Sequence, residues 1–342
     1  MSTSNYSKFK ENALSKLKGL PVDKETFCPL PFVHVSTMPH GEVKLCCRAQ
    51  PPKDGRNPNI KDADFNLKDY WHSDEMNEVR DDLILGKKNH QCSNCWKMED
   101  NEIVSLRMNR ITDLMENEAY KKNLKKYLVD REVDFSIPLI ELKLSNVCNF
   151  KCRMCWPKDS SKWVGDWDKV SKFYSEGDQR YIEEIVDGNN LRKSRVMNLF
   201  EKDEYFVDQL LELMSTVEEI EFAGGEPLMD PIHYRVLASI PNPENVTLKY
   251  STNLSIMKMG KHNVIDLWKK FNIALVKKEC PNIDVIKGST CISGMNAEEL
   301  GETAEAIVFE LGVHWHTSRV QWPDFLHANV CSPIQLQTGI DG

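Results

Sequence analysis

Three cysteines, Cys148, Cys152 and Cys155, follow one another with the spacing C-x3-C-x2-C. Thiolates bind soft metals and iron–sulfur clusters, and three so close together can converge on one inorganic centre. A four-iron cluster held by three cysteines leaves one iron open to another ligand. Polar neighbours such as Lys151 and Arg153 argue against three cysteines buried as small apolar side chains. A zinc site is the alternative, although zinc usually takes paired C-x2-C or Cys/His ligands.

The segment before these cysteines alternates apolar residues at Ile140, Leu142 and Leu144, which predicts a half-buried strand at 139–146. The cysteines then leave its C-terminal end, where α/β folds usually place their chemistry. Further strands are predicted at 218–224, 246–252, 283–292 and 313–321, with helices at 206–217, 262–271 and 297–311. This alternation is typical of a parallel sheet, curled into a full or partial barrel. The long polar segment 157–205 is interpreted as an insertion that could act as a lid.

Small and polar residues end the second and third predicted strands. Gly224, Gly225 and Glu226 close the second strand: glycines allow close backbone approach to a ligand, and the carboxylate can accept hydrogen bonds from an ammonium group. A turn with a solvated glutamate is the alternative. The third strand ends in Ser251, Thr252 and Asn253, which could contact a ligand or could cap a turn or helix.

A second set of cysteines lies near the N-terminus. It comprises Cys28, Cys46, Cys47, Cys92 and Cys95. Two predicted strands at 32–35 and 42–45, a helix at 71–85, the C-x2-C pair and a charged helix at 107–127 make up this region. A hairpin flanked by cysteines and followed by C-x2-C could fold around one metal.

Composition narrows the class of protein. The chain has 342 residues, 28% of them charged, and a net charge of −8, which argues against a general nucleic-acid or anionic-membrane partner. No apolar segment has the length of a secretory signal or a membrane span. Eleven cysteines without an export signal point to a reducing, cytoplasmic environment and to metal-binding or reactive thiols.

The C-x3-C-x2-C loop after a strand, together with the GGEP sequence, resembles the radical S-adenosylmethionine (radical SAM) superfamily. The resemblance implies that Cys148, Cys152 and Cys155 hold a 4Fe-4S cluster whose open iron takes the amino and carboxylate groups of S-adenosylmethionine. It assigns Gly224, Gly225 and Glu226 to the amino group of that cofactor, and Met154 to the position beside its adenine. Ser251, Thr252 and Asn253 are similar to the family's ribose and carboxylate contacts.

The N-terminal cysteines resemble the auxiliary-cluster (SPASM/twitch) domain of radical SAM enzymes. Here Cys28, one of Cys46 and Cys47, Cys92 and Cys95 would hold a second iron–sulfur cluster, with structural zinc as the alternative. The implied fold is α/β: a small cysteine-rich α+β domain followed by a partial (β/α)6 TIM-like barrel. The expected organisation is a lead-in (1–24), an auxiliary-cluster domain (25–130), a radical SAM core (135–325) and a tail (326–342).

The activity implied by the resemblance is reductive cleavage of S-adenosylmethionine to a 5′-deoxyadenosyl radical. That radical abstracts hydrogen from a peptide, sugar or small metabolite. An electron donor such as flavodoxin or ferredoxin is expected, and no side chain is assigned a catalytic role of its own. A strand and helix are compressed after Phe271, so the alternatives are a catalytically impaired relative and a zinc-binding interaction protein.

Overall fold

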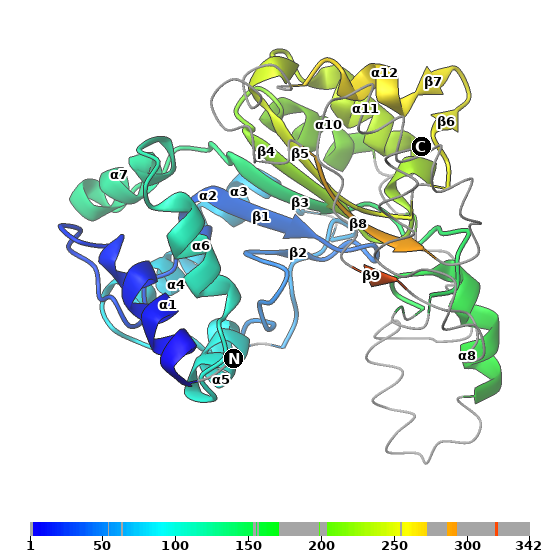
Figure 1. Ribbon diagram of the computed structural model, residues 1–342. Coiled ribbons are helices and arrows are strands. Elements are labelled where there is room, and N and C mark those ends of the chain that lie inside the picture. Colours follow the sequence, from blue (N-terminus) through cyan, green and yellow to red (C-terminus); the bar gives the residue numbers. More distant parts are fainter. Residues whose placement is uncertain are drawn as a thin grey trace, which may run out of the picture. The chain divides into compact units, whose positions relative to one another are not determined.

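The computed structural model describes residues 3–53, 55–62, 64–152, 155, 157–170, 198, 204–253, 255–271, 286–292 and 319–320 (Figure 1). The chain divides into two compact units. The first unit comprises Met1–Thr37 and Gly41–Glu141, and the second comprises Met38–His40 and Leu142–Gly342. Within the described residues, no helix combines the length and apolar character needed to cross a bilayer.

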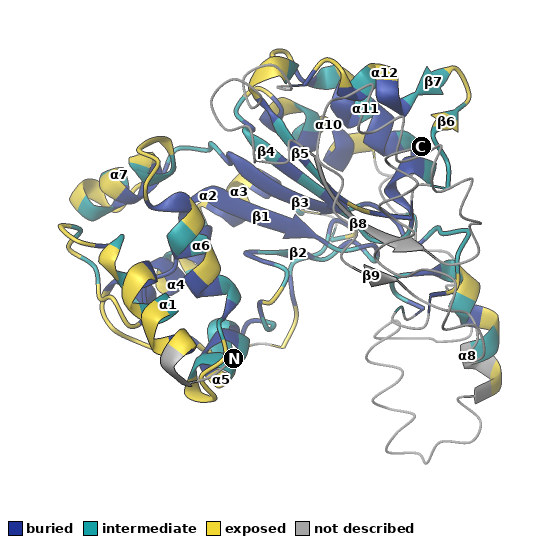
Figure 2. Cartoon of the chain, viewed as in Figure 1, coloured by how far each residue is buried: buried dark blue, intermediate teal, exposed yellow. Residues whose placement is uncertain are grey.

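The first unit is mostly helical. Its helices are α1 (Thr3–Ser15), α2 (Leu30–Val33), α3 (Leu67–Trp71), α4 (Asp74–Ile84), α5 (Ser93–Asp100), α6 (Leu106–Leu114) and α7 (Lys122–Asp130). Strand β1 (His34–Thr37) pairs antiparallel with β2 (Val43–Lys44) and parallel with β3 (Leu139–Lys143), with His34 opposite Leu139. Helices α1 and α6 pack together, and α1, α4, α6 and α7 each have buried and exposed residues, whereas α2 is wholly buried (Figure 2). The cysteine-rich α+β character expected for this region is therefore present.

Two predicted elements of this unit were wrong in detail. Phe32 and Val33 belong to α2 rather than to a strand, because Pro29 and Pro31 suit the first turn of a helix, and β1 begins only at His34. The predicted helix 107–127 is two helices, α6 and α7. They are separated by a turn in which the Asn117 side chain accepts a hydrogen bond from the Ala119 N–H at 2.9 Å.

The predicted helix at 71–85 begins three residues late, at Asp74. The Ser73 hydroxyl caps it by accepting from the Met76 N–H at 3.2 Å, and Trp71 instead ends α3. Gly86 follows its end with a φ of +84°, a left-handed conformation that glycine adopts without strain. The N-cap at Ser73 and the glycine at position 86 therefore mark the two ends of the helix.

The second unit contains a parallel sheet, as the sequence predicted. Its strand order is β3-β4-β5-β8-β9, with β4 (Glu219–Ala223), β5 (Thr247–Thr252), β8 (Ile286–Ile292) and β9 (Arg319–Val320). Phe222 on β4 lies opposite Tyr250 on β5, and Tyr250 opposite Gly288 on β8. The helices are α8 (Val164–Val170), α10 (Glu204–Leu213), α11 (Pro231–Ser239) and α12 (Val264–Trp268), and a short hairpin joins β6 (Lys258–Met259) to β7 (His262–Asn263).

Several predictions fall on residues outside the described part of the chain. These are most of the insertion 157–205, the compressed stretch after Phe271, the helix 297–311, the early part of the strand 313–321 and the tail 326–342. The barrel is therefore not confirmed, whereas the parallel sheet is. Helix α10 begins at Glu204 and ends at Leu213, so the predicted helix 206–217 is present but shorter.

An aromatic cluster fills the core between β4, β5 and the helices that follow them. His233 on α11 is fully buried, and its Nε2 lies 2.8 Å from the Tyr250 hydroxyl, which also accepts from Trp268 Nε1 at 3.0 Å. The Phe222 ring packs edge-on against His233, with centroids 4.7 Å apart. Burial lowers the pKa of His233 to about 3, so the ring is neutral in the folded protein at neutral pH.

His233 should therefore make the second unit sensitive to acid. Below its ordinary pKa of about 6.5 the unfolded chain takes up a proton that the folded chain refuses, so stability falls as the pH drops towards 3. We expect the wild type to lose about 1.4 kcal/mol more per pH unit than His233→Phe between pH 6 and 4. Denaturant unfolding of both proteins at several pH values measures this difference. Parallel pH profiles would contradict it.

Candidate functional site

The segment 148–155, here called the cysteine loop, leaves the C-terminal end of β3 and brings three thiols together. Cys152 is buried, while Cys148 and Cys155 are half-buried, and all three are free thiols. The Cys155 N–H donates to the Cys152 carbonyl at 3.0 Å. A hydrogen bond with Cys152 and then burial raise the pKa of Cys155, and burial raises that of Cys148. Without a metal the Cys148 and Cys155 thiols are protonated at neutral pH.

The residues that follow the loop hold it in place. The Ser160 hydroxyl donates to the Phe150 carbonyl at 2.7 Å, and the Trp163 indole donates to the Cys152 carbonyl at 2.8 Å. The Asn146 side chain donates to the Pro157 carbonyl at 2.8 Å. The first two bonds satisfy carbonyls of the cysteine loop, and the third joins the residues on either side of it, so the thiols are positioned before any ligand binds.

The two glycines of GGEP bring the end of β4 directly against residues 145–147, which lead into the cysteine loop. Gly225 N–H donates to the Ser145 carbonyl at 2.8 Å, and Glu226 N–H donates to the Val147 carbonyl at 2.7 Å. Gly224 has a φ of +105°, and a Cβ on Gly225 would lie 2.1 Å from the Val147 carbonyl oxygen. Only glycine allows this approach, which places Glu226 beside Cys148.

Glu226 is buried, with 1% of its surface exposed, and it links the tips of β4 and β5. Its carboxylate accepts hydrogen bonds from the Thr252 hydroxyl and, at 2.7 Å, from the Asn253 N–H. The Leu228 N–H donates to it at 3.2 Å. Burial raises the pKa of Glu226, while these three donors counteract the rise. A buried carboxylate of this kind attracts a cationic group, and no Lys or Arg is among these donors.

Asn253 joins the tip of β5 to the cysteine loop. Its side-chain N–H donates to the Asn149 side-chain oxygen Oδ1 at 3.0 Å and lies 3.8 Å from the Cys148 sulfur. Its own side-chain oxygen accepts from the Ser255 N–H at 2.9 Å, and Asn149 donates to the Ser255 hydroxyl at 2.7 Å. Asn149 and Ser255 were not predicted as site residues. The polar position of Asn149 between two cysteines was the one available signal.

Of the other predicted cofactor contacts, some lie at the site and some do not. Thr252 and Asn253 are buried and reach Glu226, whereas Ser251 is exposed. Successive side chains point to opposite faces of a strand, so Ser251 lies on the other face of β5 from Thr252. Met154 lies outside the described residues.

The first unit gathers its own group of thiols, here called the N-terminal cysteine set: Cys28, Cys46, Cys92 and Cys95. Cys28 lies just before α2, Cys46 follows β2, and Cys92 and Cys95 stand at the start of α5. Burial, and next Cys95, raises the pKa of Cys28 to about 12, and burial followed by Cys28 raises that of Cys46 to about 12. Burial raises the pKa of Cys92, and Cys28, Cys46 and Cys95 all add to it. The four thiols therefore lie within electrostatic reach of one another. Cys47 is half-buried.

Comparison with known proteins found a similarity that includes the N-terminal cysteine set. A family model described as SPASM, an iron–sulfur cluster-binding domain, matches residues 28–96, a span that contains all four thiols. A radical SAM cyclopropyl synthase, TigE of Paramaledivibacter caminithermalis, is 23% identical over 171 residues. These two similarities support a radical SAM protein of the SPASM/twitch type.

The matched region in this radical SAM relative is limited. It covers 49% of the present chain and 32% of TigE, so the chain spans about a third of that protein's length. No solved structure matches the chain. The similarity is thus confined to part of each chain, and the reaction and its substrate are separate questions.

Proposed function

We propose that this protein is an iron–sulfur enzyme that cleaves S-adenosylmethionine reductively and uses the resulting 5′-deoxyadenosyl radical to take a hydrogen atom from its substrate. One observation carries the proposal: Glu226 and Asn253 lie against the cysteine loop, so a thiolate set and a buried carboxylate converge at the ends of neighbouring parallel strands. The fold proposed for the second unit is a partial (β/α)6 barrel. Its parallel strands are the described part of that fold.

The donor chemistry of the cysteine loop fits a 4Fe-4S cluster. Cys148, Cys152 and Cys155 would hold three irons, and the cluster supplies the one electron that breaks the sulfonium–carbon bond. Glu226 would accept hydrogen bonds from the ammonium group of S-adenosylmethionine, because its burial strengthens such a contact. Bound S-adenosylmethionine would supply the 5′-deoxyadenosyl group, with methionine as the leaving group and a peptide, sugar or small metabolite as the hydrogen donor.

The N-terminal cysteine set is proposed to hold a second iron–sulfur cluster with four protein ligands, Cys46 being the buried member of its pair. The match of residues 28–96 to an iron–sulfur cluster-binding domain supports a cluster over zinc. Four protein ligands favour electron relay, with flavodoxin or ferredoxin as the donor class.

The test is anaerobic reconstitution with iron and sulfide, followed by dithionite and S-adenosylmethionine. We expect about eight irons and eight sulfides per chain, and production of 5′-deoxyadenosine and methionine in equal amounts. A fully loaded protein that forms no 5′-deoxyadenosine would contradict the activity and favour an impaired relative. Zinc in place of iron at both cysteine sets would favour the zinc-binding alternative.

A further inference from the structure

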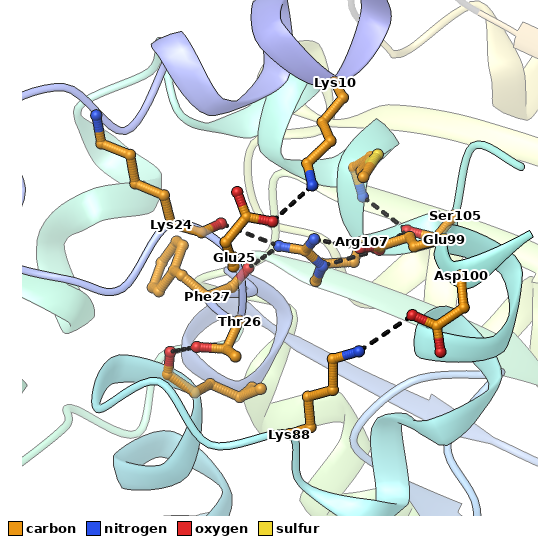
Figure 3. Close-up of polar contacts among 12 residues, drawn as sticks. Lys10, Lys24, Glu25, Thr26, Phe27, Lys88, Glu99, Asp100, Ser105 and Arg107 are labelled. Atoms are coloured by element: carbon orange, nitrogen blue, oxygen red, sulfur yellow. Dashed lines mark hydrogen bonds and ion pairs between the residues drawn. The ribbon is translucent and has the colours of Figure 1, made fainter. Parts of the chain in front are cut away.

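Arg107 on α6 is almost completely buried, and its guanidinium group connects two segments that carry cysteines. Its Nε donates to Glu99 at 2.9 Å and a second nitrogen donates to the other carboxylate oxygen, so the pair is bidentate. Its remaining nitrogen donates to the Phe27 carbonyl at 3.0 Å (Figure 3). The exposed fractions of the two side chains are 1% and 11%. This geometry is the strong form of a charge-assisted contact.

Both partners of Arg107 lie next to thiols of the N-terminal cysteine set. Phe27 directly precedes Cys28, and Glu99 stands one helical turn after Cys95 on α5, so the two side chains share a helix face. The Arg107 backbone lies close enough to Cys95 to lower the pKa of its thiol against the larger effect of burial. Arg107 therefore fixes the segment of Cys28 relative to the segment of Cys95.

The Arg107 charge also acts on these thiols. It lowers the pKa of Cys28 and Cys92 against the larger, raising effect of burial, and Glu99 acts in the opposite direction on Cys28 and Cys95. Charges in a buried, low-dielectric environment act over longer distances than charges in water. The cysteine set thus lies in the field of two buried charges of opposite sign.

We propose that Arg107 is a positioning residue for the N-terminal iron–sulfur centre. Arg107 holds Cys28 and Cys95 at the separation that the cluster needs, and its charge favours the reduced state of the cluster. Glu99 orients the guanidinium group and acts in the opposite direction on the reduction potential. A fixed positive charge stabilises the more negative, reduced cluster, so Arg107 raises the potential and Glu99 lowers it. The inference rests on the proposal that this set holds an iron–sulfur cluster.

A purely structural ion pair is the competing explanation, and the chain offers a matched control for it. Arg80 in the same unit is also fully buried. It donates to the Pro31 carbonyl at 2.9 Å and to the Asn77 side chain at 2.8 Å, and it stacks 4.8 Å from the Trp71 ring. Burial lowers the pKa of Arg80 to about 10, and the groups that act on it are tyrosines. Replacing Arg80 should therefore disturb the core without changing the field at the thiols.

The experiment uses the full chain with Cys148, Cys152 and Cys155 replaced by alanine, so that only the N-terminal centre is reconstituted. Iron and sulfide per chain and the midpoint potential in a spectroscopic redox titration are measured. They are compared for this parent and for its Arg107→Gln, Arg107→Lys, Glu99→Gln and Arg80→Gln derivatives. A parent that binds no iron would contradict the proposed cluster itself. If the parent binds iron and sulfide, the derivatives test the role of Arg107.

We expect Arg107→Gln to lower the potential and Glu99→Gln to raise it. Arg107→Lys should keep the potential near that of the parent but bind less iron, because lysine lacks the planar fork. Arg80→Gln should leave the potential unchanged. If Arg107→Gln fails to hold iron, the direction in which Glu99→Gln shifts the midpoint potential tests the inference. An unchanged or lowered potential in Glu99→Gln, or shifts of the same sign in both variants, would overturn the inference.

Discussion

Replacing Gly225 with alanine should disrupt the cofactor end of the second unit and abolish binding of the cluster held by Cys148, Cys152 and Cys155. The added Cβ would lie 2.1 Å from the Val147 carbonyl oxygen and 2.7 Å from the Val147 carbonyl carbon. These contacts are with backbone, which cannot rotate away as a side chain does. The β4 tip must then separate from the loop, and we expect a loss of more than about 3 kcal/mol in the free energy of unfolding.

Gly165 is the matched control for this substitution. It lies exposed on α8 in the same unit, and a Cβ there meets no atom within 4 Å. Gly165→Ala should be neutral or stabilise the protein by about 0.5–1 kcal/mol, because alanine is the better helix former. Thermal unfolding and iron analysis measure both variants. A Gly225→Ala protein with wild-type stability and iron content would contradict the close packing described for GGEP.

Replacing Cys152 with alanine should remove one cluster and leave the other. Cys152 lies between the other two thiols in the loop, and the N-terminal cysteine set lies in the other unit. Iron should fall from about eight to about four atoms per chain, and 5′-deoxyadenosine should fall to background. The reciprocal variant Cys28→Ala should lose the N-terminal iron and retain the cluster of the cysteine loop.

The two variants together separate the roles of the two cysteine sets. Metal analysis gives the iron that remains, and product analysis shows which cluster is needed for cleavage. Loss of all iron in Cys152→Ala would contradict two independent centres. Production of 5′-deoxyadenosine by Cys152→Ala would contradict the assignment of the cysteine loop to S-adenosylmethionine.

Much of the second unit's fold was predictable because its signals are local. Alternating apolar residues marked β3, and the strands predicted at 218–224 and 246–252 overlap β4 and β5. The errors arose where two local signals compete. The apolar β-branched and aromatic residues at Phe32 and Val33 favour a strand, whereas the prolines at positions 29 and 31 favour the start of a helix, and the prolines decided the outcome.

The residues of the candidate site were predictable to the extent that they belong to compact motifs. The cysteine loop and GGEP were visible because their residues are neighbours in sequence. The contact of Asn149 with Asn253 joins residues 104 apart, and the contact of Arg107 with the Phe27 carbonyl joins residues 80 apart. No sequence periodicity encodes such pairs, so the residues that orient each thiol set emerged only from the fold.

The central claim is that the cluster of the cysteine loop binds S-adenosylmethionine directly at its open iron. Pulsed electron–nuclear double resonance on the reduced protein tests this, using cofactor labelled with ¹⁵N in its amino group and ¹⁷O in its carboxylate. Cys28→Ala and Cys95→Ala remove the N-terminal centre so that one cluster gives the signal. We predict hyperfine couplings from both labels. A reduced cluster that shows neither coupling at saturating cofactor would contradict the claim.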